Sequence, residues 1–186
     1  MNKQLIEWFK SLNQRQIRYG LGGSWMLKEH GIPIKPKDID LFIHMSDLNK
    51  CLDLIEPYQL EKANNPDSLF KSEYFTTLQF ESMSIDIIGG FAYLHDQGLY
   101  KAYFDDMSIV SEFIIDDSSI PLMSLEEWYV LYSIMGRQKQ CELIEHHWFI
   151  NGINHPRLLQ RQLTCSLDHH SRSRLISYLD KNNTNL

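Results

Sequence analysis

Three aspartates occur in apolar, alternating stretches, a pattern that can bring carboxylates together. Asp38 and Asp40 lie in "DIDLFIH", and Asp86 lies in "SIDIIGGF". Successive side chains alternate along a strand, so Asp38 and Asp40 would project to one face with α-carbons about 7 Å apart. An exposed edge strand with two solvated aspartates would show the same local pattern. If the strand bearing Asp86 lies beside the first, however, three carboxylates converge.

Converging carboxylates repel, and each raises the pKa of the others unless a cation lies between them. Mg²⁺ suits such a site because it takes oxygen ligands and keeps positions open for water and substrate phosphates. Two ions in one site can clamp the attacking and leaving oxygens of a phosphoryl group. We therefore predict a magnesium site at Asp38, Asp40 and Asp86 that takes two ions during turnover.

Gly22, Gly23 and Ser24 lie between a predicted strand and a predicted helix, where backbone N–H groups can face an anion. Glycine lets a phosphate approach the backbone without meeting a side chain. Ser24 can add a hydroxyl donor, or it can simply cap the helix. The stretch matches neither a Walker loop nor a dinucleotide-binding fingerprint. We predict a phosphate cradle next to the carboxylates.

Together, "GLGGSW", "DIDLFI" and "SIDII" resemble the DNA polymerase β-type nucleotidyltransferase superfamily, over residues 19–45 and 83–90. The glycine variant is similar to small stand-alone bacterial enzymes related to the lincosamide and aminoglycoside nucleotidyltransferases. The resemblance implies an α/β (α+β) fold, with a mixed sheet flanked by helices and then a C-terminal helical segment. It also implies a nucleoside triphosphate donor, an acceptor hydroxyl on a small molecule or a protein, and release of pyrophosphate.

The resemblance also implies roles for individual residues. Asp38 and Asp40 would bind both metals, and Asp86 would hold the catalytic metal and help to deprotonate the acceptor. Gly23 and Ser24 would hold the β- and γ-phosphates. Related small cores often complete their acceptor cleft with a second subunit, so a homodimer is compatible with the resemblance.

The C-terminal half departs from the family pattern. Tyr132 stands where related enzymes often have a lysine, and the expected Lys-Asp pair reads Lys139-Gln140. Lys37, Arg137 and Lys139 remain as phosphate or acceptor contacts. These departures leave open a second reading, a catalytically degenerate module that binds a nucleotide or a partner. A toxin–antitoxin or phage-defence role on the same fold also stays open.

The elements that must position these residues follow from periodicity. Apolar residues at helical spacing predict a helix over residues 3–13, and "IRYGL" and "DIDLFIH" predict strands. Residues 58–123 are rich in β-branched and aromatic residues, which favours several antiparallel strands. The S-x-x-E pattern at Ser124 predicts the start of a helix. We predict a nucleotidyltransferase core over residues 1–123 and a helical lobe over residues 124–186.

Composition narrows the class of protein further. The chain has 186 residues, 43% of them hydrophobic and 23% charged, as in a globular domain. Its apolar runs are too short to span a membrane, and its N-terminus is too polar for a signal peptide, so we expect a cytoplasmic protein. Three separated cysteines argue against a disulfide framework. The net charge of -6 disfavours broad binding to nucleic acid duplexes.

Overall fold

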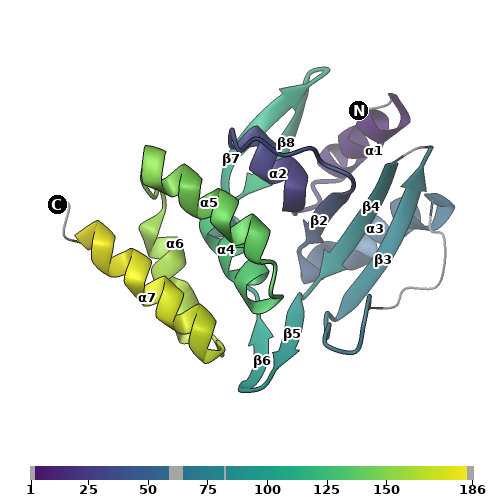
Figure 1. The fold of residues 1–186 in the computed structure, drawn as a ribbon. Helices are drawn as coiled ribbons and strands as arrows, with labels where there is room; N and C mark the ends of the chain where they lie inside the picture. The colour runs from purple at the N-terminus through teal and green to yellow at the C-terminus, as the bar shows by residue number, and fades with distance from the viewer. Residues whose placement is uncertain (1–2, 59–64, 82, 184–186) are drawn as a thin grey trace.

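The computed structural model describes residues 3–58, 65–81 and 83–183 (Figure 1). The strands are β1 Tyr19–Leu21, β2 Ile39–Ile43, β3 Tyr74–Phe80, β4 Met83–Gly89, β5 Ala92–His95, β6 Gly98–Lys101, β7 Ile109–Ile115 and β8 Ser118–Met123. The α-helices are α1 Lys3–Gln14, α2 Gly23–Glu29, α3 Leu48–Ile55, α4 Leu125–Ile134, α5 Gln138–Asn151, α6 Pro156–Arg161 and α7 His169–Asn183.

Six strands form one mixed sheet in the order β3-β4-β2-β1-β8-β7, and β5 and β6 form a separate hairpin. The pairs β2–β4 and β1–β8 are parallel, whereas β1–β2, β3–β4 and β7–β8 are antiparallel. This architecture confirms the predicted fold class, a mixed sheet flanked by helices and followed by a C-terminal helical segment. The antiparallel pairing predicted within residues 58–123 is also confirmed.

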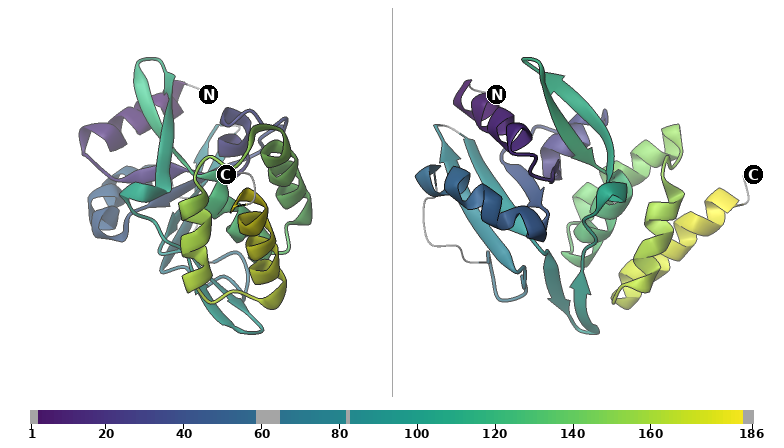
Figure 2. Two further views of the ribbon diagram at one scale, coloured as in Figure 1. Left: turned by 90° about the vertical axis from the view of Figure 1, so that its left-hand side faces the viewer. Right: turned by 180° about the vertical axis from the view of Figure 1, so that it is seen from behind.

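Helices α1 and α3 cover one face of the sheet, as the rear view shows (Figure 2, right). The α1 residues Leu5 and Phe9 are fully buried against this face, with Ile39 and Leu41 of β2. The alternation predicted for β2 is therefore confirmed, because its isoleucines and leucine face this core while Phe42 joins a cluster on the opposite face. Asp40 must share that opposite face with Phe42.

The opposite face is covered by α2 and α4. All ten residues of α4 are buried, and Trp128 stacks on Phe42 with ring centroids 5.5 Å apart. Ser124 Oγ accepts a hydrogen bond from the Glu127 N–H at 3.2 Å, which confirms the predicted start of this helix. In the described ranges, no helix is both long and apolar enough to cross a membrane.

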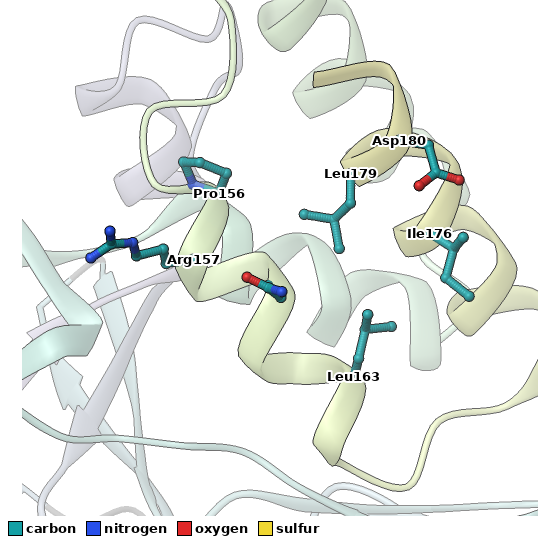
Figure 3. A pocket seen from close by; sticks show the side chains of 7 residues that line it. Pro156, Arg157, Leu163, Ile176, Leu179 and Asp180 are labelled. Atoms are coloured by element: carbon teal, nitrogen blue, oxygen red, sulfur yellow. The ribbon is translucent and has the colours of Figure 1, made fainter. Parts of the chain in front are cut away.

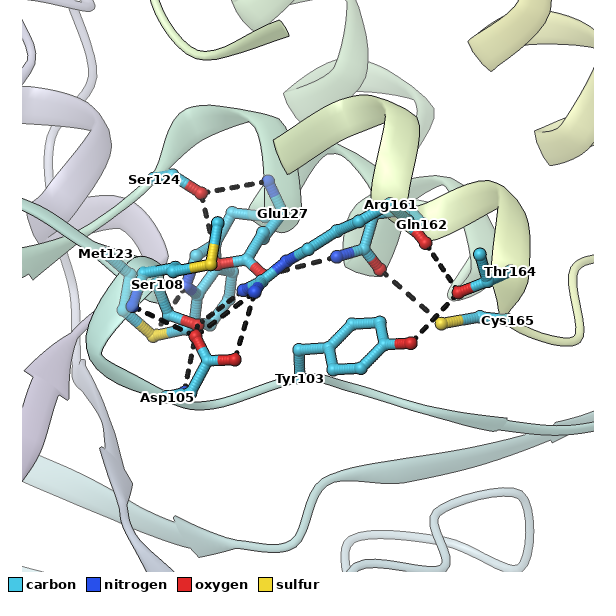
Figure 4. A network of polar contacts seen from close by, with 12 residues as sticks. Tyr103, Asp105, Ser108, Met123, Ser124, Glu127, Arg161, Gln162, Thr164 and Cys165 are labelled. Atoms are coloured by element: carbon cyan, nitrogen blue, oxygen red, sulfur yellow. Dashed lines mark hydrogen bonds and ion pairs between the residues drawn. The ribbon is translucent and has the colours of Figure 1, made fainter. Parts of the chain in front are cut away.

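A partly buried polar network fixes α6 against α4 (Figure 4). The Arg161 guanidinium donates to both carboxylate oxygens of Asp105, at 3.1 and 3.0 Å, and its Nε donates to Glu127 Oε1 at 3.2 Å. Gln162 Nε2 donates to the same glutamate oxygen. Since Glu127 precedes Trp128, this network holds the N-terminal half of α4 in place over the sheet.

Candidate active site

The register of the central strands brings two of the predicted aspartates together. Strands β2 and β4 run parallel, and Asp40 lies directly opposite Asp86. Asp38 is exposed and lies one residue before β2 begins. On the far side of β4, Thr77 of β3 lies opposite Asp86, and its hydroxyl donates to Asp86 Oδ1 at 2.7 Å. The condition stated for the two acidic strands, that they lie side by side, is therefore met.

Asp40 and Asp86 are partly buried, and the carboxylates of the site repel one another. Burial, together with the negative charges of Asp38 and Asp86, raises the pKa of Asp40 to about 7, against the opposing effect of Arg137. Burial also raises the pKa of Asp86, although the Thr77 hydrogen bond opposes this shift. Bringing a cation into the site would relieve this unfavourable charge.

The glycine pair is held from two sides. Gly23 has a φ of +60°, and a β-carbon built on it would lie 1.8 Å from Asp40 Oδ2. A β-carbon built on Gly22 would lie 1.8 Å from the ring of Trp128. Any larger residue would therefore displace Asp40 or Trp128, so the close approach of these two side chains explains both glycines.

Ser24 does not cap α2. The N-cap residue is Gly22, which offers no side-chain cap, and α2 begins at Gly23. The Ser24 hydroxyl is buried and has no hydrogen-bond partner. A buried hydroxyl without a partner is costly, and a bound ligand can satisfy it. Of the two predictions for this serine, the structure thus contradicts capping and leaves the hydroxyl available as a donor.

Ser24 and the carboxylates line one cavity of about 300 Å³. This volume is at the lower end of the range for small-molecule sites. Its lining combines polar residues with apolar, largely aromatic ones. The lining residues are Ser24, Asp38, Asp40, Pro66, Asp67, Phe70, Phe75, Asp86, Ile88, Phe91, Trp128, Tyr132, Met135, Arg137 and Gln140.

Of the six predicted nucleotide contacts, Ser24 and Arg137 line this cavity, and Gly22, Gly23, Lys37 and Lys139 are not among its lining residues. Arg137 and Gln140 line it, as does Tyr132, whose burial raises the pKa of its hydroxyl far above 10 and keeps it protonated. Lys37 and Lys139 are exposed and are not among the lining residues. Trp25 packs against the core cluster that lies under α1 and α3.

The aromatic residues that line the cavity were not predicted from the sequence, although the spacing of some of them indicates a shared face. Trp128, Tyr132 and Met135 have helical spacing, so the attention given to Tyr132 could have extended to the whole face. Phe75 shares a strand face with Thr77, the partner of Asp86. By contrast, the local sequence around Phe70 and Phe91 gives no sign that they line the same cavity.

The donor atoms fit magnesium. Carboxylate oxygens are the hard ligands that Mg²⁺ prefers, and it commonly uses one or two of them together with water and substrate phosphates. Across residues 3–58, 65–81 and 83–183, no group of three or more His, Cys, Asp and Glu side chains forms a ready metal site. The carboxylates would therefore supply part of the coordination, and water and phosphate oxygens would complete it.

A second cavity, of about 360 Å³, lies between α6 and α7 (Figure 3). The charged residues that line it are one arginine and one aspartate, whereas four aspartates and one arginine line the first cavity. It is lined by Pro156, Arg157, Gln160, Leu163, Ile176, Leu179 and Asp180. The cavity lined by Asp38, Asp40 and Asp86 is therefore the stronger candidate for an active site.

No known family model matches the sequence, and no curated protein matches it. Among solved structures, the chain is similar to a provisionally assigned nucleotidyltransferase from Thermotoga maritima. The TM-score is 0.61 at 18% identity, over 80% of this chain and 92% of the other. It is also similar to ANT(2″)-Ia, solved in complex with adenylyl-2″-tobramycin, with a TM-score of 0.51 at 14% identity over 97% of both chains. The fold is thus the nucleotidyltransferase fold, and the predicted resemblance is confirmed at that level.

Proposed function

We propose that the protein is a Mg²⁺-dependent nucleotidyltransferase. It transfers a nucleoside monophosphate from a nucleoside triphosphate to a hydroxyl group of a small-molecule or protein acceptor, and it releases pyrophosphate. The observation that carries this proposal is the placement of Asp40 opposite Asp86, with Asp38 and the unpartnered Ser24 hydroxyl in the same cavity. The shared fold supports it, since ANT(2″)-Ia holds an adenylylated small molecule.

Each residue has a role in this proposal. Asp38, Asp40 and Asp86 would hold Mg²⁺, which supplies positive charge to the reacting phosphate. The Ser24 hydroxyl and the Gly23 backbone would donate to the β- and γ-phosphates. Arg137 lines the same cavity and would contact phosphate as well.

Three further residues have less direct roles. Gly22 has no side chain and would therefore let the phosphate-binding loop lie close against the ring of Trp128. Lys37 and Lys139, which are exposed, would contact phosphate only where the nucleotide extends beyond the cavity.

The reaction is an in-line displacement at the α-phosphorus. The acceptor oxygen forms a bond to the α-phosphorus, and the bond from that phosphorus to the bridging oxygen of the β-phosphate breaks. Pyrophosphate leaves with the bridging oxygen and its electron pair. The hydroxyl proton passes to Asp86, which the Thr77 hydrogen bond keeps oriented.

A thermal-shift titration with ATP, GTP, CTP and UTP, with and without Mg²⁺, tests the nucleotide site. Ligand at about 100 times its dissociation constant stabilises a protein by about 2.7 kcal/mol. In a domain of this size that raises the melting temperature by about 5–10 °C. We expect such a shift with one triphosphate, only with Mg²⁺, and its loss in Asp40→Asn. Pyrophosphate release then tests turnover, and no shift with any triphosphate in folded wild-type protein would refute the proposal.

One observation favours a second function, a nucleotide-binding module without turnover. The buried Tyr132 lines the cavity where the resemblance implies a lysine, and Gln140 replaces the expected aspartate there. The triphosphate would then have Arg137 as its cation among the described lining residues. A Mg²⁺-dependent shift without pyrophosphate release for any acceptor would favour this second function.

A further inference from the structure

The cavity has a distinct chemistry on the side of β3 and β4, and we infer from it the class of the acceptor. The acceptor is a small alcohol with an aromatic or apolar body, which packs against Phe75, Phe70 and Ile88. This inference rests on the nucleotidyl transfer proposed above and specifies its substrate. We call the part of the cavity lined by these three residues the acceptor half.

Two rows of side chains cross the sheet next to each other. Asp40 pairs with Asp86, and Asp86 with Thr77, so the first row is polar across β2, β4 and β3. Two residues further along the face, Phe42 pairs with Ile88, and Ile88 with Phe75, so the second row is apolar. The rows are about 7 Å apart. A molecule with a hydroxyl at the first row therefore places its body on the second.

Only part of the apolar row is open. Over β2, the ring of Trp128 stacks on Phe42, which is 2% exposed. Over β3, Phe75 is only half-buried and lines the cavity, and so does Phe70 from the preceding loop. Trp128 and Tyr132 of α4 also line the cavity but are only 3% and 7% exposed, so the more exposed aromatic surface is at the β3 side of the aspartates.

In-line geometry assigns that side to the acceptor. Attack and departure occur in line, so the acceptor oxygen and the leaving pyrophosphate lie on opposite sides of the α-phosphorus. Ser24 follows β1, the aspartates are on β2 and β4, and Phe75 is on β3. With the phosphates at Ser24, the acceptor lies toward β3, the outermost strand on the side away from α4–α7 (Figure 1).

The aspartate that precedes Phe70 in the chain is bound to its own loop. The Asp67 carboxylate accepts hydrogen bonds from the backbone N–H groups of Leu69, at 2.7 Å, and Phe70, at 3.2 Å. It is therefore engaged in shaping the loop that carries Phe70. The acceptor half itself is apolar, because Phe75, Phe70 and Ile88 line it. Aromatic rings favour contact with flat or apolar groups.

The inference can be tested with 2-phenylethanol as a neutral aromatic probe and tobramycin as a polyamine probe. Saturation-transfer NMR is recorded on the full chain with Mg²⁺ and the α,β-methylene analogue of the triphosphate that gives the thermal shift. We expect saturation transfer to 2-phenylethanol, and no displacement of it by tobramycin. In Phe75→Ala the probe should bind about tenfold more weakly, the loss expected when one aromatic contact is removed.

Matched variants separate the possible failures. Phe149→Ala removes a ring that is 88% exposed on α5 and should leave probe binding unchanged. Phe70→Ala serves as the second variant if Phe75→Ala does not fold. The inference would be overturned if wild type showed no saturation transfer to 2-phenylethanol, or if tobramycin displaced this probe. It would also be overturned if Phe75→Ala lost the nucleotide shift but kept its affinity for the probe. Absence of the nucleotide shift in wild type would instead overturn the proposed function.

Discussion

Replacing Asp40 with asparagine should make the free protein more stable while it abolishes the response to Mg²⁺ and nucleotide. The Asp40 carboxylate is partly buried and faces Asp38 and Asp86, so its charge opposes folding when no cation is present. Asparagine has nearly the same shape and carries no charge. The two effects of the substitution therefore have opposite signs, and a general loss of structure cannot produce both.

The magnitude follows from the pKa of Asp40, which rises from 3.8 to about 7. Each pKa unit corresponds to 1.36 kcal/mol, so a rise of about three units sets an upper limit of about 4 kcal/mol at pH 8. Because the side chain retains some contact with solvent, screening reduces this to about 1–3 kcal/mol. For a domain of this size, the melting temperature should rise by about 2–12 °C.

The assay is thermal unfolding at pH 8 with EDTA, for wild type, Asp40→Asn and the control Asp53→Asn. The Asp53 side chain is 79% exposed and pairs with Arg15, so the control should change stability little. Adding Mg²⁺ and the preferred triphosphate should then stabilise wild type but not Asp40→Asn. If Asp40→Asn melted at or below the wild-type temperature in EDTA, the argument from carboxylate repulsion would be wrong.

Three further predictions concern the surrounding structure. Gly23→Ala should lose about 1–3 kcal/mol more than Gly31→Ala in urea unfolding, because both have positive φ but only Gly23 meets a carboxylate; equal losses would refute the close approach. Arg161→Met should cost about 3–5 kcal/mol by leaving Glu127 buried without its cation, and adding Glu127→Gln should restore much of the loss; simple additivity in the double-mutant cycle would contradict this. Hydrogen bonds from an arginine and a lysine hold the pKa of Asp47 well below its usual range, so its stabilisation is present above the unfolded-state value of about 3.9 and is lost as the pH falls below it. Urea unfolding should therefore show the gap between wild type and Asp47→Asn closing from about pH 5 to pH 2, and a gap independent of pH would count against the ion pair.

The sequence predicted the parts of the site that depend on local pattern. Alternation in "DIDLFI" placed Ile39 and Asp40 on opposite faces, and the structure confirms this. The pairing of Asp40 with Asp86 could be stated only as a condition, because it joins strands more than 40 residues apart and depends on the register of the whole sheet. The two tryptophans show the same limit. Trp25 beside the glycines packs into the core, whereas Trp128, far away in the chain, reaches the cavity.

The arrangement around the glycines bears on whether the site is functional or degenerate. Gly22 lies against Trp128 and Gly23 against Asp40, so the loop is fixed from both α4 and β2. In this fixed position the Ser24 hydroxyl is buried without a partner, and Asp40 is held close to two other carboxylates. Each feature destabilises the free protein, and a single substitution, Ser24→Ala or Asp40→Asn, would remove it. A protein that binds no ligand would be more stable without these two features. A Mg²⁺–nucleotide complex, by contrast, would give the Ser24 hydroxyl a partner and offset the charge of the carboxylates. The presence of both features therefore favours a site that binds its ligand.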